Sequence, residues 1–182
     1  MHQNAIQLTA GKEPAVVLFE AMTQAQAWMD EAFALAEEAA ADGEIPIGAV
    51  VVDRAGTIIG RGRNRRESGD PLGHAEIYAI SEAAKAIGDW RLEGTTMVVT
   101  LEPCAMCAGA LVNARIDRLI FAAFDPKAGF CGSLGNLVQD PRLNHRLEVI
   151  SGVGEERSRE LLQRFFQSLR QRSRKTERWQ SG

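Results

Sequence analysis

The sequence predicts an α/β fold, in which helices cover both faces of one β-sheet. Strand-like runs alternate with helix-like runs along most of the chain, and this order is typical of a layered α/β architecture. The chain has 182 residues, of which 45% are hydrophobic and 25% are charged. That length and composition suit a single globular domain with a substantial core. No apolar run approaches the ~20 residues that a membrane-spanning helix needs.

The first predicted elements are a helix and a β-hairpin. Residues 22–41 carry an apolar stripe at helical spacing, and Asp42 and Gly43 end the pattern. The stripe consists of Trp28, Ala32, Leu35, Ala36 and Ala39. Residues 47–53 and 57–62 are rich in β-branched side chains, and the turn-forming residues between them predict a hairpin.

The rest of the chain continues the alternation of helices and strands. After a polar loop at residues 64–73, a helix is predicted over 74–87, a buried strand over 95–101 and a second helix over 104–114. A further strand is predicted over 118–124. The last helix has an apolar face formed by Leu161, Leu162, Phe165, Phe166 and Leu169.

Residues 1–21 are predicted to form an N-terminal extension of unassigned role. The apolar stretch at residues 15–22 is too short to span a membrane. It is also a poor signal peptide, because only one lysine precedes it and an acidic helix follows. Three cysteines are too few, and odd in number, for a disulfide framework. These features favour a protein of the reducing cytoplasm.

Acidic and basic residues are separated along the chain, although the formal net charge is only −3. The segment from Glu20 to Glu44, with both ends included, has seven acidic residues and no lysine or arginine. The basic residues of two later segments are Arg61, Arg63, Arg65 and Arg66, and then Arg164, Arg170, Arg172, Arg174, Lys175 and Arg178. The net charge argues against a nucleic-acid partner, whereas the arginine clusters favour one. Such charge runs are also common on solvated faces.

One histidine and two cysteines have the spacing of a metal site. His74 lies at the predicted start of one helix. Cys104 and Cys107 lie one turn apart at the start of another, where Pro103 suits the first turn. One imidazole and two thiolates give zinc three protein ligands and leave the fourth tetrahedral position open, as in catalytic zinc sites. Helix N-termini at both ligand sets favour anionic species.

Other interpretations of the two cysteines stay open at this point. They could form a redox pair, half of a structural zinc site, or two small core residues. No thioredoxin-like pattern surrounds them, which disfavours a redox pair. Cys131 could close the site as a fourth ligand, but structural zinc cysteines usually occur in close pairs and Cys131 has no such neighbour. We expect Cys131 to be a small buried thiol.

Glu76, two residues after His74, is the predicted proton-transfer group. A carboxylate in the first turn of this helix can be directed at water in the open metal position, where zinc lowers the pKa of the water to about 7. The alternative is that Glu76 only stabilises the helix through its dipole.

His-x-Glu followed by Pro-Cys-x-x-Cys resembles the signature of the zinc-dependent nucleoside and base deaminases. Further segments are similar to the bacterial tRNA-specific adenosine deaminases, and these are residues 63–65 (RNR), 100–110 (TLEPCAMCAGA), 125–134 (DPKAGFCGSL), 143–146 (LNHR) and 161–166 (LLQRFF). The resemblance implies a deaminase domain over residues 22–172 and a basic tail over 173–182. It implies a three-layer α/β/α cytidine-deaminase-like fold with a five-stranded mixed sheet. The implied reaction is hydrolytic conversion of the wobble adenosine of an arginine tRNA to inosine, by a homodimer with one zinc ion per chain.

Carried onto this sequence, the resemblance implies a role for each matching residue. His74, Cys104 and Cys107 hold zinc, Glu76 shuttles protons, and Asn64 hydrogen-bonds the extruded base. The other residues implied to contact substrate or RNA are Arg65, Ala75, Asp125, Lys127 and Phe166. The loop that leads to the histidine is one residue shorter than in the family pattern, which affects the placement of its arginines.

Two other functions are compatible with the zinc motif. A deaminase of free guanine or cytosine needs only a small closed pocket and gains nothing from arginine clusters. A non-catalytic, zinc-stabilised RNA-binding scaffold would not need the proton shuttle, yet Glu76 is present. The sequence therefore favours an adenosine deaminase that acts on RNA.

Overall fold

The computed structural model describes the backbone of residues 14–180 and the side chains of residues 20–172. The elements in chain order are α1 (Pro14–Ala41), β1 (Gly48–Val52), β2 (Ile58–Arg63), α2 (Ala75–Ile87), β3 (Thr96–Leu101), α3 (Ala105–Asn113), β4 (Arg118–Ala123), β5 (Glu148–Ser151) and α4 (Glu155–Gln180). None of the helices in the described part of the chain is long and apolar enough to cross a membrane.

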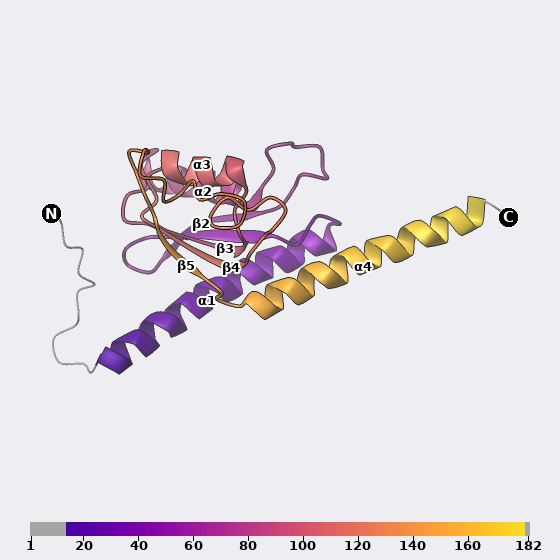
Figure 1. Ribbon diagram of the computed structural model, residues 1–182, viewed down its shortest axis with the longest axis horizontal. Coiled ribbons are helices and arrows are strands. Elements are labelled where there is room, and N and C mark those ends of the chain that lie inside the picture. Colours follow the sequence, from indigo (N-terminus) through magenta and orange to yellow (C-terminus); the bar gives the residue numbers. More distant parts are fainter. Residues whose placement is uncertain (1–13, 181–182) are drawn as a thin grey trace.

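The five strands form one mixed sheet in the order β2-β1-β3-β4-β5. β1 pairs antiparallel with β2 and β3, whereas β3 with β4 and β4 with β5 are parallel. α2 and α3 cover one face of the sheet, and α1 with the first part of α4 covers the other (Figure 1). The predicted three-layer α/β fold is confirmed.

Alternate side chains of the strands supply the two halves of the core. On β1, Ala49 and Val51 face the layer of α2 and α3, while Val50 and Val52 face α1. This alternation follows from the period of two along a strand, and it makes β1 apolar on both faces because both are covered. The apolar stripe of α1 meets the second half of the core, where Phe33 is fully buried.

Glycines in β1 and β2 let two helices approach the sheet at backbone contact. A Cβ atom on Gly62 would lie 1.9 Å from the carbonyl oxygen of Ala75 at the start of α2. A Cβ on Gly48 would lie 2.0 Å from the carbonyl oxygen of Ala32 in α1. Since any other side chain would force the helix away, these positions fix the distance between helix and strand. At Gly62 the contact lies next to His74.

The first helix is longer than predicted. α1 begins at Pro14 rather than at residue 22. Proline suits the first position of a helix, and no glycine or proline interrupts residues 15–41. Part of the predicted N-terminal extension is therefore the first turns of α1, and residues 1–13 lie outside the described residues.

Two features near the C-terminus also differ from the residue pattern. β5 was not recognised from the pattern, because this edge strand has four residues and leaves three of them exposed. α4 runs to Gln180, through the residues predicted to be a tail, and extends past the body of the molecule (Figure 1). The predicted basic side chains of Arg174, Lys175 and Arg178 lie outside the described residues.

Candidate active site

Four strands bring their connecting segments to one edge of the sheet. β3 and β4 are parallel and end at this edge, and the antiparallel pairing of β1 makes it the edge where β1 begins and β2 ends. A pocket of about 610 Å³ opens there, a size typical of small-ligand sites. Its walls are formed by Ile45, Ile47, Asn64, Arg66, His74, Glu76, Leu101, Glu102, Cys104, Phe124, Asp125, Pro126, Lys127, Ala128, Arg159, Leu162, Gln163 and Phe166.

The predicted metal ligands converge beside this pocket. His74 Nδ1 lies 3.6 Å from Cys104 Sγ and 3.5 Å from Cys107 Sγ. The three ligand atoms all lie within 4.8 Å of one another. Among the histidine, cysteine and acidic residues of the described part of the chain, no other group of three or more could hold a metal ion. One imidazole and two thiols at these distances suit three corners of a tetrahedral site.

His74 and Cys104 occupy the positions immediately before their helices. Both have an extended backbone, with φ −88° and ψ 146° at His74 and φ −70° and ψ 174° at Cys104. Neither side chain caps its own helix, so both remain available to a ligand. α3 therefore begins at Ala105, and the expectation that Pro103 lies in its first turn was wrong. The Pro103 carbonyl instead accepts a hydrogen bond from the Phe130 N–H.

The two ligand thiols have opposite pKa shifts. Hydrogen bonding with Cys107, and then with His74, lowers the pKa of Cys104 to about 3. The same sulfur pair, together with burial, raises the pKa of Cys107. A divalent cation at this place would supply the positive charge that favours deprotonation of both thiols. This donor chemistry fits a zinc-type ion.

Glu76 lies in the first turn of α2 and lines the pocket. Only 4% of the residue is exposed, and this burial raises the pKa of its carboxyl. The nearby His74 opposes the shift. A buried carboxyl beside a metal-binding group is placed as proton-transfer groups commonly are.

A second buried carboxylate, Glu102, ties the loop after β4 to the pocket. It accepts hydrogen bonds from the backbone N–H groups of Asp125, Cys131 and Ser133, each at 2.9 Å, and from the Ser133 hydroxyl. The loop passes so close that a Cβ on Gly129 would lie 2.2 Å from Glu102 Oε2. The sequence did not single out Glu102, because its partners lie more than twenty residues later.

Some of the residues predicted to contact substrate line the pocket, and others do not. Asn64, Asp125, Lys127 and Phe166 line the pocket. Ala75 is fully buried, with its carbonyl against the Gly62 backbone.

The two arginines that follow Asn64 point to different places. Arg66 lines the pocket, whereas Arg65 lines a separate surface groove, where its guanidinium carbon lies 5.5 Å from the centre of the Tyr78 ring. Cys131 is 4% exposed, and its Sγ lies 3.9 Å from the Pro103 oxygen. It is outside the group of metal ligands, as expected for a small buried thiol.

α4 contributes more to the pocket than the sequence indicated. Arg159, Leu162, Gln163 and Phe166 all line it. Their spacing of three, four and seven residues places them on one face of the helix, and this spacing could have identified them together.

Known proteins share this sequence and architecture. Residues 23–170 match the family model of the MafB19-like deaminases. Over 152 residues the chain is 51% identical to the tRNA-specific adenosine deaminase of Bacillus subtilis (strain 168), an alignment that covers 83% of this chain and 94% of that protein. The chain belongs to the tRNA-specific adenosine deaminase family.

Two further relatives agree with this membership. The tRNA-specific adenosine deaminase of Haemophilus influenzae is 49% identical over 144 residues, which cover 79% of this deaminase and 83% of that one. A solved structure from a study of A-to-I editing by tRNA:A34 deaminases at the wobble position of transfer RNA superposes with a TM-score of 0.71 and 44% identity. It covers 74% of this chain and 98% of that chain. The cytidine-deaminase-like arrangement of this deaminase is therefore shared with a family member of known structure.

Proposed function

We propose that this deaminase hydrolyses the wobble adenosine of tRNA to inosine, with an arginine tRNA as its substrate. One observation carries the proposal: Glu76 and the His74–Cys104–Cys107 group meet at a single pocket whose rim bears cationic and aromatic side chains. The names of the relatives, which are tRNA-specific adenosine deaminases, support the same reaction.

We infer that one zinc ion is the resident metal. An imidazole and two thiolates are donors that zinc accepts readily and that magnesium and calcium do not favour. His74, Cys104 and Cys107 would hold it and leave one position open. When bound, zinc acts as a Lewis acid that makes water nucleophilic near neutral pH.

Glu76 is proposed to move the protons of the reaction. Its carboxyl accepts a proton from the water that adds to C6 of the purine and delivers a proton to N1. It then takes the remaining proton from the new hydroxyl on C6 and gives it to the 6-amino group, which leaves as ammonia as the C6 carbonyl forms. Adenosine and water are thereby converted to inosine and ammonia, and no further reactant is needed.

The rim of the pocket favours a nucleotide held within RNA. Arg66, Lys127 and Arg159 approach it from three different elements, where they can neutralise phosphates. Phe124 and Phe166 are 43% and 40% exposed at the same pocket, and exposed aromatic rings stack well on unpaired bases. A base in a loop is already partly unstacked, so less free energy is needed to extrude it.

We also propose that the chain acts as a homodimer in the cytoplasm. Large apolar side chains remain exposed on the described surface, where Ile87 at the end of α2, Trp90 in the loop that follows and Leu134 in the loop after β4 are 46%, 53% and 56% exposed. The three cysteines are free thiols, which suits a reducing compartment. Light scattering would test the dimer, for which we expect twice the chain mass of 19.9 kDa.

The substrate can be tested by incubating the protein with an anticodon stem-loop that carries a wobble adenosine. We expect inosine to form at that position, and not in a matched stem-loop with the adenosine moved one position along. Free adenosine and free guanine serve as small-molecule controls. Comparable kcat/KM for the stem-loop and for a free base or nucleoside would contradict the proposal and favour a small-molecule deaminase.

The metal site can be tested by elemental analysis. Because three ligands converge within the described residues, we expect one zinc per chain in the wild type and in Cys131→Ser, and loss of zinc in Cys104→Ser. The two substitutions are chemically identical, so each controls for the other. Loss of zinc from Cys131→Ser would indicate a closed, structural site instead.

A further inference from the structure

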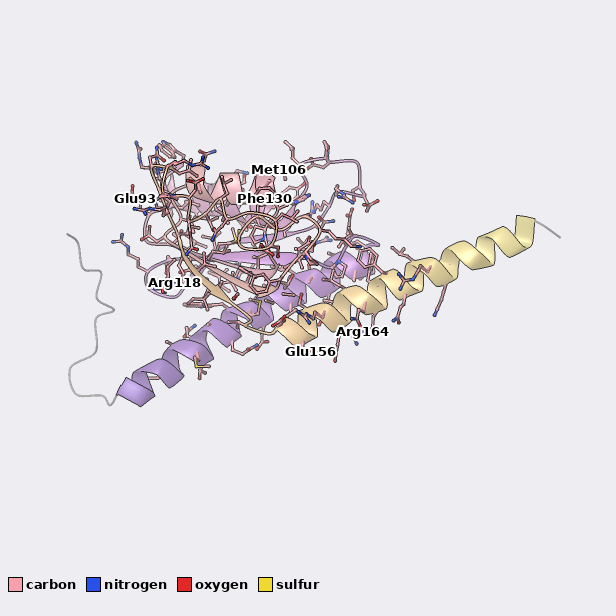
Figure 2. The ribbon with its side chains drawn as sticks, viewed as in Figure 1. Glu93, Met106, Arg118, Phe130, Glu156 and Arg164 are labelled. Atoms are coloured by element: carbon pink, nitrogen blue, oxygen red, sulfur yellow. The ribbon has the colours of Figure 1, made fainter. Side chains whose placement is uncertain are left out.

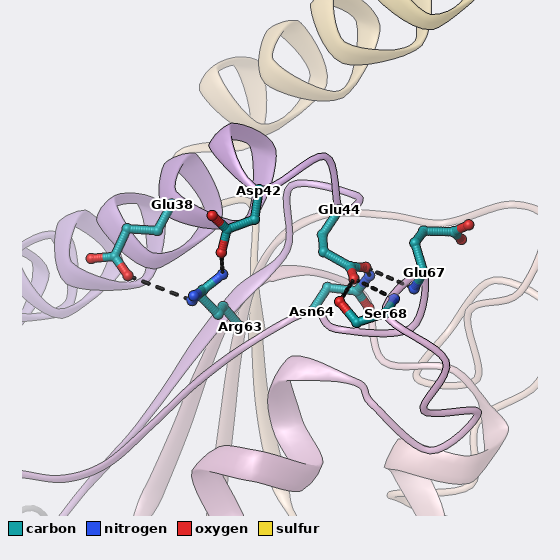
Figure 3. Close-up of polar contacts among 7 residues, drawn as sticks. All are labelled: Glu38, Asp42, Glu44, Arg63, Asn64, Glu67 and Ser68. Carbon is teal, nitrogen blue, oxygen red and sulfur yellow. Dashed lines mark hydrogen bonds and ion pairs between the residues drawn. The ribbon is translucent and has the colours of Figure 1, made fainter.

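Glu44 is a buried carboxylate that lies behind the pocket wall. It follows the turn after α1, and 2% of it is exposed. Four donors of one loop bind it: Asn64 Nδ2 at 3.0 Å and the Glu67 N–H at 2.9 Å on Oε2, and the Ser68 N–H at 2.8 Å and the Ser68 hydroxyl at 2.6 Å on Oε1 (Figure 3). Burial raises the pKa of Glu44, but the hydrogen bonds of Ser68, Glu67 and Asn64 together lower it below its ordinary value. The carboxyl is therefore ionised at neutral pH.

An ionised carboxylate determines which way the Asn64 side chain turns. It can accept hydrogen bonds but cannot donate them, so the Asn64 amide must direct its NH₂ group at Glu44. The opposite orientation would place Oδ1 against a charged oxygen. Since the nitrogen and oxygen of an amide are otherwise nearly equivalent in shape, Glu44 decides the orientation.

The other side of the Asn64 amide is open to the pocket. Asn64 is 3% exposed and shares the pocket wall with His74 and Glu76. Within residues 20–172 its Oδ1 has no hydrogen-bond partner, yet no fully buried side-chain nitrogen or oxygen there is left unsatisfied. Oδ1 is therefore not fully buried, and Asn64 is one of the residues that line the pocket. A polar atom so placed, on a side chain that is otherwise enclosed, is available to a ligand.

We propose that Glu44 is a positioning residue, which fixes the Asn64 amide and so sets the pattern of hydrogen-bond donor and acceptor that the pocket offers to the base. This inference rests on the proposed deamination of a base in this pocket. Glu44 itself is not part of the pocket wall and acts only through Asn64. Each Glu44 oxygen accepts two hydrogen bonds, one of them from a backbone N–H, so neither can become an NH₂ group without facing a donor that cannot act as an acceptor.

Glu44→Gln is the substitution that tests this role. It keeps the shape of the side chain but replaces one acceptor oxygen with a donor. If the new NH₂ group faces Asn64, the Asn64 amide can restore a hydrogen bond only by turning over. Ser68→Ala is the matched control, because it removes one hydrogen bond to Oε1 and leaves the contact between Oε2 and Asn64 in place.

Both variants are assayed with the anticodon stem-loop for kcat and KM, and for zinc content and melting temperature. We expect Glu44→Gln to lower kcat/KM by about 10- to 100-fold, the usual effect of removing a residue that orients a ligand-binding group. Ser68→Ala should stay near the wild type, and both should keep one zinc per chain. Equal losses of kcat/KM in the two variants at equal loss of melting temperature would show that Glu44 only holds the loop.

A double variant keeps the test decisive if Glu44→Gln alone folds poorly. Asn64→Asp places two carboxylates face to face, and adding Glu44→Gln restores one N–H···O contact with reversed polarity. In the double variant, one oxygen of the introduced aspartate accepts from the introduced glutamine and the other still offers an acceptor to the pocket. We therefore expect it to regain the melting temperature and part of the turnover lost by Asn64→Asp. Recovery of the melting temperature with turnover no better than that of Asn64→Asp would overturn the proposal.

The inference about Glu44 can be separated from the proposed function. Turnover of the stem-loop by the wild type tests the function, whereas a nuclear magnetic resonance measurement tests the amide. In the wild type we expect an Asn64 side-chain N–H proton to exchange slowly with water, and to exchange quickly in Glu44→Gln but not in Ser68→Ala. Fast exchange in the wild type would overturn the role of Glu44 whatever the enzyme acts on.

Discussion

Glu76 has little contact with solvent except through the pocket, because 4% of the residue is exposed and its carboxyl lies in the first turn of α2. A proton that it takes from water in the pocket is therefore easily returned to a ligand there. This confined position, rather than the helix dipole alone, explains why a glutamate two residues after a metal ligand suits acid–base chemistry.

Replacing Glu76 should separate catalysis from metal binding. We expect Glu76→Ala to keep its fold and its zinc but to lose about 10²–10⁴-fold in the single-turnover rate on the stem-loop, because the group proposed to move the proton is removed. Glu82→Ala, on the exposed side of the same helix, is the control and should retain the rate. Near-normal turnover by Glu76→Ala would remove Glu76 from the mechanism.

The buried carboxylate of Glu44 should make stability depend on acid pH. Its pKa in the folded chain lies below the ordinary 4.5, because hydrogen bonds outweigh the effect of burial. A lowered pKa adds stability that is complete above the unfolded value and is lost as the pH falls through the folded value. We expect the melting temperature to drop more steeply below about pH 4.5 in the wild type than in Glu44→Gln. Parallel pH curves would contradict this.

At the scale of helices and strands, the start of α2 is held by the contact between Gly62 and the Ala75 carbonyl oxygen. This contact sets how far His74 reaches toward Cys104 and Cys107 at the start of α3. The geometry of the His74–Cys104–Cys107 group therefore depends on Gly62, a strand residue that is not a member of the group.

Gly62→Ala should push α2 away from the sheet. A methyl group placed 1.9 Å from a backbone oxygen cannot be accommodated without movement, and overpacking of this kind costs about 1–3 kcal/mol or more. We expect a lower free energy of unfolding in denaturant and weaker zinc retention against a chelator. Gly109→Ala in α3 is the matched control, because its new methyl would meet only Leu137 Cδ2 at 3.8 Å. That variant should be neutral or slightly more stable.

Long, periodic elements were predictable from the sequence, and short or featureless ones were not. The hairpin, β3, β4, α2 and α3 were predicted close to their observed bounds, because strands covered on both faces are continuous apolar runs and the two helices follow turn signals and helix-start residues. β5 was missed since an exposed edge strand of four residues carries almost no pattern. The start of α1 was misjudged because residues 15–22 are apolar almost throughout and show no helical periodicity, and the end of α4 because residues 173–180 are mostly polar.

The candidate site divides in the same way. The metal ligands and Glu76 could be found from local spacing, because each lies beside a predicted helix start. Glu44 and Glu102 could not, since a buried glutamate is rare and both bind loop donors that are twenty or more residues away in the chain. Contacts between residues so far apart in the sequence are created by the topology of the sheet, and local residue patterns do not predict that topology.

Considered as a whole, the molecule has an acidic side and a basic extension. Arg157 of α4 pairs with Asp30 and Glu37 of α1, which attaches the first turns of α4 to the acidic helix. Farther along, Arg164 is exposed on α4 (Figure 2), and the helix continues past the pocket. The net charge of −3 therefore does not describe the surface around the pocket.

Shortening α4 should weaken RNA binding without affecting the metal. We expect a chain that ends at Gln171 to show a higher KM for the stem-loop and a shallower dependence of binding on salt, because fewer phosphates are neutralised and fewer counterions are released. Zinc content should not change. A full-length variant with Arg172, Arg174, Lys175 and Arg178 replaced by glutamine is the control for helix length. If it retains the salt dependence of the wild type, these charges do not contact the RNA.

The glycines that admit the helices also have a consequence for how the chain tolerates substitution. In a saturation mutagenesis screen for deaminase activity, Gly48, Gly60 and Gly62 should accept almost no other amino acid, because an added Cβ at each would lie within 2.2 Å of a helix carbonyl oxygen. Exposed arginines on the rim should accept several. Such a screen would therefore rank these three glycines as high as the catalytic residues, although they contact neither the RNA nor the metal nor the reacting water. Intolerance at these three glycines would reflect the short distance between helix and sheet, and it would carry no information about the chemistry of the site.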